Sequence, residues 1–135
     1  MANLFDLEIV TPKRVEFSGQ VASVTCPGVE GRFQVLRGHA PFLSSLDMGL
    51  MKVTGEDGND VLYAISGGIA QVFHNQMRIL ADTAERADSI DIERARSARE
   101  RAEQRLKTKE ESTDMERARL ALMRAINRLQ VAERV

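Results

Sequence analysis

Arginine side chains are the groups in this sequence with the clearest chemistry. After residue 86, ten of the twelve basic residues are arginines: Arg94, Arg96, Arg99, Arg101, Arg105, Arg117, Arg119, Arg124, Arg128 and Arg134. A guanidinium group offers a planar fork of donors that binds a carboxylate or a phosphate through two hydrogen bonds. The pattern predicts a surface that meets an anion, unless these arginines only form a solvated helix face paired with neighbouring glutamates.

A second group of residues interrupts two short apolar runs. The stretch from Glu30 to Leu46 reads EGRFQVLRGHAPFLSSL. Gly38 and Pro41 restrict it to an unusual backbone path, and His39 can present a ring to a partner. Two interpretations stay open from these residues alone: an ordinary connection between strands, or a loop shaped for a binding partner.

No catalytic or metal-binding motif accompanies these groups. The sequence has no phosphate-binding P-loop, no Gly-x-Ser-x-Gly nucleophile motif and no pair of histidines at metal-ligand spacing. The one cysteine, Cys26, can form no intramolecular disulfide, and its place in an alternating run predicts a small core residue. Ser66-Gly67-Gly68 lacks the lysine and the helix of a phosphate cradle, so it is interpreted as a strand bend or bulge. We therefore expect no catalytic residues, no metal site and no required cofactor.

Length and charge limit the function classes further. The chain has 135 residues and a formal net charge of -1, so its overall charge does not favour binding to nucleic acid or to an anionic membrane. The N-terminal residues lack the pattern of a secretory signal, and no apolar run approaches the roughly 18 residues of a membrane span. We expect a soluble protein, or one held at a membrane only through partners.

In the first 86 residues, turn-forming Gly and Pro are spaced as in a small all-β domain. All nine Gly and all three Pro lie at or before Gly68, between short runs with strand-like alternation. Two hairpins are expected, one turning at residues 55–59 and the other near His74 and Asn75. Aromatic residues make up only 4% of the chain, so the core should be mostly aliphatic. These features predict an antiparallel sandwich or barrel.

From residue 87 onward the periodicity becomes helical. One apolar stripe, in steps of three and four, consists of Ile92, Ala95, Ala98, Ala102 and Leu106. A second stripe consists of Met115, Ala118, Leu122, Ala125, Leu129 and Ala132. Thr113 and Glu116 have the spacing of a capping box, which predicts the start of the second helix. We predict an αα-hairpin of two antiparallel helices, marginally stable because both stripes are thin.

Charge follows the same division of the chain. Residues 1–86 hold 7 basic and 10 acidic side chains, a net charge of -3, whereas residues 87–135 hold 12 and 10, a net charge of +2. The basic part is therefore the predicted helix pair.

Three segments together resemble the epsilon subunit of F-type ATP synthases. They are the stretch from Glu30 to Leu46, YAISGGIAQV at residues 63–72, and ILADTAERADSIDIERA at residues 79–95. The opening run LFDLEIVTPKRVEFSGQVASVTCPG fits the same pattern, so the resemblance covers nearly the whole chain. It implies an all-β N-terminal sandwich of about ten strands at residues 1–86, followed by a C-terminal αα-hairpin at residues 87–135.

The resemblance also implies a place in a larger complex. The family's sandwich sits at the foot of the rotating gamma subunit, on the ring of c subunits. Its helices fold down beside the sandwich or extend along gamma into the alpha/beta catalytic head, where many bacterial members block ATP hydrolysis. The chain would be a non-catalytic, peripheral subunit of the central stalk at the cytoplasmic face of the bacterial inner (plasma) membrane, bound to that membrane only through the complex. The residues assigned to gamma and the c-ring are Glu30, Arg32, Arg37, Gly38, His39, Ala40, Pro41 and Phe42.

The loop departs from the family pattern at three positions. Members often carry Glu where Arg32 stands, Gly near Gln34 and Pro where Arg37 stands. The first departure matters most, because an acidic contact to the c-ring would become basic. The resemblance therefore locates the ring-facing loop but leaves the contact made by Arg32 open.

The helix pair also contains a segment, SIDIERA at residues 89–95, that is similar to the start of the first helix in ATP-binding members. The positions that match their ATP site are Glu85, Ile90, Asp91, Arg94, Ala95, Arg101, Arg124 and Arg128. Arg94 and Arg101 share one helix face, and Arg124 and Arg128 share another. Four inward guanidinium groups would repel one another unless an anion such as a triphosphate joined them. ATP would then be a regulatory ligand that this chain does not hydrolyse.

Other functions of the helix pair stay open at this point. Asp91 would only cap the first helix if the arginines form a solvated face, and the chain would then be mainly a structural rotor link with little inhibition. If ATP binds, the helix pair is instead an ATP-sensing module. If the helices extend and inhibit, we expect Arg117, Arg124 and Arg128 to meet acidic surfaces of the catalytic head.

Overall fold

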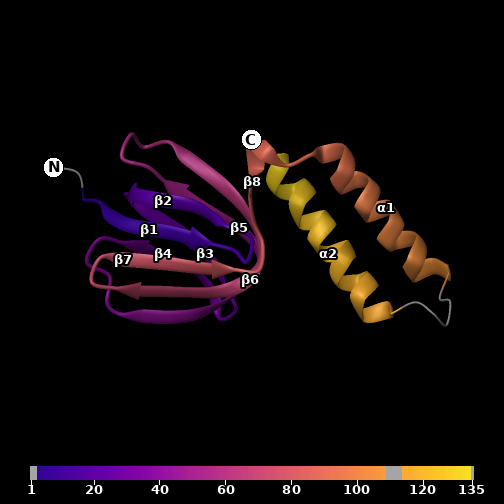
Figure 1. The fold of residues 1–135 in the computed structure, drawn as a ribbon, viewed down its shortest axis with the longest axis horizontal. Coiled ribbons are helices and arrows are strands. Elements are labelled where there is room, and N and C mark those ends of the chain that lie inside the picture. The colour runs from indigo at the N-terminus through magenta and orange to yellow at the C-terminus, as the bar shows by residue number, and fades with distance from the viewer. Residues whose placement is uncertain (1–2, 109–113, 135) are drawn as a thin grey trace. The chain divides into compact units, whose positions relative to one another are not determined.

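The computed structural model describes residues 3–108 and 114–134. The chain divides into two compact units, residues 1–86 and residues 87–135. The first is built of strands and the second of helices (Figure 1).

Eight strands form the first unit within the described residues (Figure 1). They are β1 (Phe5–Val10), β2 (Val15–Val21), β3 (Ser23–Gly28), β4 (Gly31–Leu36), β5 (Phe42–Thr54), β6 (Asp60–Phe73), β7 (Gln76–Ala81) and β8 (Ala84–Arg86). They pair in the order β2-β1-β7-β6-β5-β3-β4, with β8 on β6. The pairs are antiparallel except β1 with β7, which is parallel.

The two longest strands, β5 and β6, belong to both layers of the sandwich. Residues 42–46 pair with residues 68–72, and residues 48–54 pair with residues 60–66. β7 pairs with the second half of β6 and β8 with its first half. The predicted β-sandwich is therefore confirmed, although it has eight strands and not about ten. β5 and β6 run continuously for 13 and 14 residues respectively, which keeps the number of strands low.

Two glycines allow β6 to pass from one layer to the other. Gly67 and Gly68 have φ angles of +117° and +136°, values that side chains other than glycine rarely adopt. A Cβ atom on Gly68 would collide with the carbonyl oxygen of Leu80 and the Cα atom of Ala81 on β7. The interpretation of this segment as a strand bend with closely approaching backbones is thus confirmed.

The core between the layers is mostly aliphatic, as expected. Its largest fully buried side chains include Leu7, Ile9, Ile65 and Ile79. Phe5 and Tyr63 are the buried aromatic residues of this cluster. Burial of this aliphatic surface is the main force that holds the two layers together.

Cys26 also belongs to this core, which confirms the prediction of a small core residue. Burial raises the pKa of its thiol from 9.0 to about 12, and the positive charge of Arg32 opposes this shift. The thiol is therefore uncharged at neutral pH.

Both expected hairpin turns are present. Between β5 and β6, the N–H of Gly55 donates to the carbonyl of Asn59 (3.0 Å), and Asp57 accepts hydrogen bonds from the backbone and side chain of Asn59. Between β6 and β7, His74 and Asn75 have φ angles of +49° and +59°. Two consecutive positive φ values are typical of the two-residue type I′ turn that suits the twist of a hairpin.

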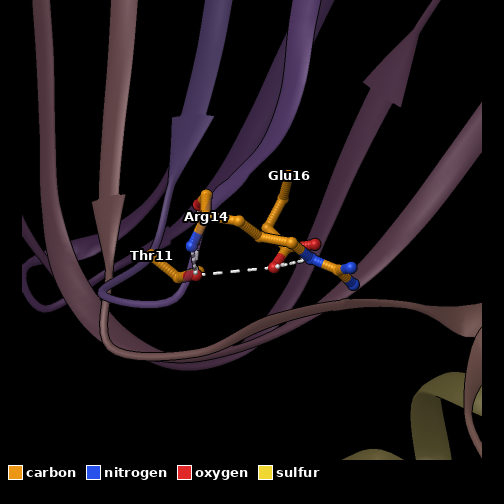
Figure 2. A network of polar contacts seen from close by, with 3 residues as sticks. All are labelled: Thr11, Arg14 and Glu16. Atoms are coloured by element: carbon orange, nitrogen blue, oxygen red, sulfur yellow. Dashed lines mark hydrogen bonds and ion pairs between the residues drawn. The ribbon is translucent and has the colours of Figure 1, made fainter.

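A polar network closes the turn between β1 and β2 (Figure 2). The Thr11 N–H donates to the carbonyl of Arg14 (2.9 Å), and the Arg14 N–H donates to the Thr11 hydroxyl (3.4 Å). That hydroxyl lies 3.4 Å from Glu16 Oε1, which also accepts from Arg14 Nε at 3.0 Å. These bonds hold the turn at the point where the β1–β2 register shifts.

The second unit contains a short 3-10 helix, η1 (Ala87–Ser89), and two antiparallel helices, α1 (Ile92–Thr108) and α2 (Met115–Ala132) (Figure 1). The predicted αα-hairpin is confirmed, and Ala95, Ala102, Ala118 and Ala125 are almost fully buried along its seam. Ile92 is the exception to the predicted stripes, because 39% of its surface remains exposed.

The start of α2 differs from the prediction of a capping box. Asp114 is the N-cap residue, and its side chain accepts a hydrogen bond from the Arg117 N–H at 3.1 Å. Thr113, the predicted cap, lies outside the described residues. Aspartate caps a helix as well as Thr does and also favours its positive end, so the helix begins as predicted but on a different side chain.

Candidate interaction sites

A tight turn shapes the loop between β4 and β5. The His39 N–H donates to the carbonyl of Leu36 at 3.1 Å, which closes a four-residue turn with Gly38 in its third position. Gly38 has a φ angle of +83°, the value that a type II turn requires there. The sequence-based expectation of an unusual backbone path at Gly38 is confirmed. Arg37 beside it is exposed, and His39 is half-buried.

Aromatic rings gather where this loop enters β5. The ring of Phe42 packs edge to face against Phe33, at 5.0 Å between centroids, and against His39, at 5.5 Å. Phe42 and its neighbour Leu43 still expose 36% and 69% of their surfaces. Ala40 and Pro41 are also exposed. The loop therefore presents a largely apolar surface, and the ring of Phe33 packs against it.

His39 has a defined hydrogen-bonding role. Its Nδ1 atom lies 2.8 Å from the carbonyl oxygen of Ala40. A carbonyl oxygen only accepts, so Nδ1 is the donor, and in the neutral form of the ring Nε2 is left as an acceptor. The ring can thus receive one hydrogen bond from a partner's donor beside the apolar surface.

Glu30 and Arg32 lie at the other end of β4. Glu30 is exposed in the two-residue turn between β3 and β4, next to Val29. Arg32 pairs with Pro27 of β3, and its Nη1 atom donates to the carbonyl of Leu50 on β5 at 3.1 Å. Pro27 has no N–H to offer β5 at the place where the β3–β5 register breaks. The Arg32 guanidinium therefore replaces a missing backbone donor, a role that the sequence did not reveal.

The eight residues predicted for partner binding thus fall into two groups. The turn with Glu30 precedes β4, and the loop from Arg37 to Phe42 follows it. At a rise of about 3.3 Å per residue, the two ends of β4 lie about 17 Å apart. The Glu30 carboxylate lies at one end of β4 and the exposed Phe42 and Leu43 lie at the other, so the groups suit two different partners or two regions of one.

Asp91 caps α1 in the same way as Asp114 caps α2. Its side chain accepts from the Arg94 N–H at 3.1 Å, and its carbonyl accepts from the Ala95 N–H at 3.0 Å. Of the other residues predicted for an ATP site, Ile90 and Ala95 are buried, whereas Glu85 is half-buried in β8 of the first unit. The capping interpretation of Asp91 is confirmed by these bonds.

The four predicted arginines share one side of the helix seam. Arg94, Arg101, Arg124 and Arg128 each come one residue before a seam residue: Ala95, Ala102, Ala125 and Leu129 respectively. One residue corresponds to a rotation of about 100° around a helix. In an antiparallel pair the positions just before the seam face the same side on both helices, because a two-fold axis relates the two helices. Arg105 and Arg117, which precede Leu106 and Ala118, lie on this side too.

The opposite side of the seam carries mixed charges. There Arg96 pairs with Glu93 (3.3 Å) and Arg99 pairs with Glu103 (2.8 Å). The side with six arginines is called the arginine face below (Arg94, Arg101, Arg105, Arg117, Arg124 and Arg128). Within the described helices and their caps it has two carboxylates, the capping Asp91 and Asp114, which precede Ile92 and Met115. Its arginines outnumber its carboxylates, so this side is strongly positive and suits an anion, whereas the opposite side is a solvated surface of mixed charge.

Metal and membrane features are limited. Over residues 3–108 and 114–134, no three His, Cys, Asp or Glu side chains are grouped so that they could hold a metal ion. Neither described helix is both long and apolar enough to cross a membrane.

Two family models match the chain one after the other. They are ATP synthase, Delta/Epsilon chain, beta-sandwich domain, at residues 4–87, and ATP synthase, Delta/Epsilon chain, long alpha-helix domain, at residues 88–133. The ATP synthase epsilon chain of Desulforamulus reducens is 45% identical over 109 residues, covering 81% of this chain and 82% of the relative. That of Desulfatibacillum aliphaticivorans is 46% identical over 110 residues, covering 82% and 78%.

A solved structure shows the same likeness. A chain in the mitochondrial ATP synthase of Euglena gracilis, from an OSCP/F1/c-ring assembly, superimposes with a TM-score of 0.81 at 26% sequence identity. The match covers 97% of this chain and 82% of that chain.

Proposed function

The chain belongs to the ATP synthase epsilon-chain family and is a non-catalytic subunit of the stalk, and we propose that it links the gamma subunit to the c-ring. The loop from Arg37 to Phe42 binds gamma, and the turn with Glu30 binds the polar loops of the ring. The position of the subunit is then the cytoplasmic face of the bacterial inner membrane, peripheral and held there by the complex.

The separation of the two groups by β4 carries this proposal. The apolar end, with exposed Phe42 and Leu43, suits a rigid apolar partner surface. The polar end offers the carboxylate of Glu30, while the Arg32 guanidinium donates to the sandwich's own backbone. We therefore assign the acidic ring contact to Glu30 and give Arg32 an internal role.

The gamma contact is tested with a catalytic head that contains gamma but lacks epsilon and the c-ring. Phe42→Ala should weaken binding of the full chain about tenfold or more, because a partly buried aromatic anchor is lost. Val29→Ala is the matched control, since Val29 is also exposed and apolar but lies at the ring-facing end of β4. Equal losses in both variants would refute the assignment of the two ends.

The ring contact is tested in membrane vesicles that contain the complete synthase. Glu30→Lys should reduce proton pumping driven by ATP hydrolysis, since it reverses the charge at the proposed contact. Binding of this variant to the isolated head should stay as in the unaltered chain. Unchanged pumping by Glu30→Lys would remove Glu30 from the ring contact.

The arginine face supports a second role, regulation through an anion. Six guanidinium groups on one side of the helix pair, beside the two capping carboxylates Asp91 and Asp114 of the described helices, suit either acidic surfaces of the alpha/beta head or regulatory ATP. Contact with the head makes the helix pair an inhibitor of ATP hydrolysis, and ATP would stabilise the folded-down form. Arg94, Arg101, Arg124 and Arg128 are the groups proposed to hold the triphosphate.

Two matched triple variants separate these roles from general effects of charge. Arg94, Arg101 and Arg124 are changed to Gln in one variant, and Arg96, Arg99 and Arg119, from the opposite side, in the other. Only the first variant should fail to suppress ATP hydrolysis when it is added to a catalytic head that lacks epsilon. Calorimetry with ATP and magnesium then tests the ligand, and a full chain that gives no heat at millimolar ATP is not an ATP sensor.

A further inference from the structure

Asn75 occupies an unusual backbone position for a residue with a side chain. It is the second residue of the β6–β7 turn, where its φ angle is +59°. Asparagine tolerates this left-handed conformation better than most residues, and glycine adopts it freely. Since paired Phe73 and Gln76 close the turn, the conformation is fixed by the hairpin itself.

The same residue joins three separate segments of the chain. Its carbonyl accepts a hydrogen bond from the Asp6 N–H at the start of β1, at 3.0 Å. Its side-chain Oδ1 accepts from the Gly38 N–H at 2.7 Å. Gly38 lies 37 residues away in sequence, in the loop between β4 and β5. The side-chain bond therefore ties that loop, at Gly38, to the β6–β7 turn.

The anchored residue is the one on which the shape of the loop depends. Gly38 sits in the third position of the turn that His39 and Leu36 close, with a φ angle of +83°. Its amide points away from that turn to Asn75, so the bond fixes the peptide plane between Arg37 and Gly38. With that plane fixed, the rings of His39 and Phe42 keep their edge-to-face arrangement on the surface.

Resting on the function proposed above, we propose that Asn75 is a positioning residue for gamma binding: its side chain holds the loop from Arg37 to Phe42 in the binding shape before gamma arrives. A loop that is already ordered loses less conformational entropy on association, so the tie raises affinity without touching the partner. Exposed Phe73 precedes this turn and follows Val72, the β6 partner of Phe42.

Two substitutions at this position distinguish positioning from folding. Asn75→Gly keeps the left-handed turn and removes only the acceptor, whereas Asn75→Asp keeps both the turn conformation and an acceptor oxygen. Binding of each full-length variant to the epsilon-depleted catalytic head is measured together with its melting temperature. Hydrogen exchange of the Gly38 amide, followed by NMR, reports whether the tie itself is present.

We expect Asn75→Gly to bind about tenfold more weakly, the effect of losing one ordering hydrogen bond, with an unchanged melting temperature and a Gly38 amide that exchanges rapidly. Asn75→Asp should retain binding and a protected amide. Unaltered affinity in Asn75→Gly would overturn the inference. So would a loss of affinity matched by a fall in melting temperature, because that result assigns Asn75 a structural role.

Phe42→Ala distinguishes failure of the inference from failure of the proposed function. If Phe42→Ala weakens binding and Asn75→Gly does not, gamma still binds this loop and only the positioning role of Asn75 is refuted. If Phe42→Ala binds the head normally, the loop is not the gamma contact. That result refutes both gamma binding by this loop and the positioning role of Asn75.

Discussion

Gly68 shows how a single backbone position sets the shape of the sandwich. β6 passes from one layer of the sandwich to the other at this residue, whose φ angle is +136°. A Cβ atom on Gly68 would collide with the backbone of the neighbouring strand β7. Positive φ and a steric clash act together at this residue. Their contributions to the free energy of unfolding can be separated, because Gly58 has a positive φ of +82° but nothing within 4 Å of its Cβ position.

We predict that Gly68→Ala lowers the free energy of unfolding by about 3 kcal/mol or more, whereas Gly58→Ala costs about 1 kcal/mol, the typical cost of backbone strain alone. Urea unfolding of the two full-length variants measures both values. Equal losses would mean that the β6–β7 approach relaxes easily and that the clash does not matter.

Cys26 makes the stability of the sandwich depend on pH in the alkaline range. Its pKa is raised from 9.0 to about 12 by burial, so the folded protein keeps the thiol proton at a pH where the unfolded chain has lost it. The stabilisation is complete below pH 9 and declines as the pH rises towards 12. The slope for this one group approaches about 1.4 kcal/mol per pH unit in that range.

Cys26→Val should remove this slope, because it keeps an apolar side chain in the core without a titrating group. The difference in free energy of unfolding between the two proteins is measured by urea unfolding from pH 7 to pH 11. It should be constant up to pH 9 and then change in favour of the variant. A constant difference over the whole range would show that the thiol ionises in the folded protein.

At the scale of elements, hydrophobic periodicity predicted the type of each element, because that type depends on residues close together in the sequence. The alternation of the first 86 residues and the stripes after residue 87 identified the sandwich and the αα-hairpin, because burial of one face fixes the period of a strand or helix. The bend at Gly67 and Gly68 was interpreted correctly from the residue types, but periodicity alone did not show that β6 runs from Asp60 to Phe73 through it. The internal bond of Arg32 and the tie of Asn75 span 18 and 37 residues, and no local pattern predicts such pairs.

The caps of the two helices were accessible to sequence reasoning only in part. Capping by Asp91 was one of two interpretations that the sequence left open, and Thr113 was predicted as the cap of α2, where the cap is Asp114. We predict that Asp114→Ala lowers the stability of the helical unit by about 1 kcal/mol, and that Asp114→Asn, which can still accept the Arg117 N–H, has a much smaller effect. Thermal unfolding of the full chain, followed by circular dichroism at 222 nm, measures this. Equal losses would assign the stabilisation to the charge of Asp114 and not to its hydrogen bond.

At the scale of the whole molecule, the two units offer two kinds of binding. The sandwich has a net charge of -3 and presents an apolar loop, whereas the helical unit has a net charge of +2 and presents the arginine face. Apolar contacts depend little on ionic strength, but contacts between exposed charges weaken as salt shortens the Debye length from about 10 Å at 0.1 M to about 3 Å at 1 M. Salt should therefore separate attachment to gamma from inhibition of the head.

We predict that raising the salt concentration releases inhibition before it releases the subunit. Full chain is added to a catalytic head depleted of epsilon, and ATP hydrolysis and binding are measured from low to high ionic strength. Residues 1–86 alone serve as the control, since they hold the apolar loop and its sandwich core but none of the arginine face. They should bind at every salt concentration and never suppress hydrolysis.

If the full chain also fails to suppress hydrolysis at low salt while it binds, the helix pair is not an inhibitor and the chain acts as a mechanical link. If residues 1–86 suppress hydrolysis as strongly as the full chain, inhibition arises in the sandwich and the arginine face has a different ligand.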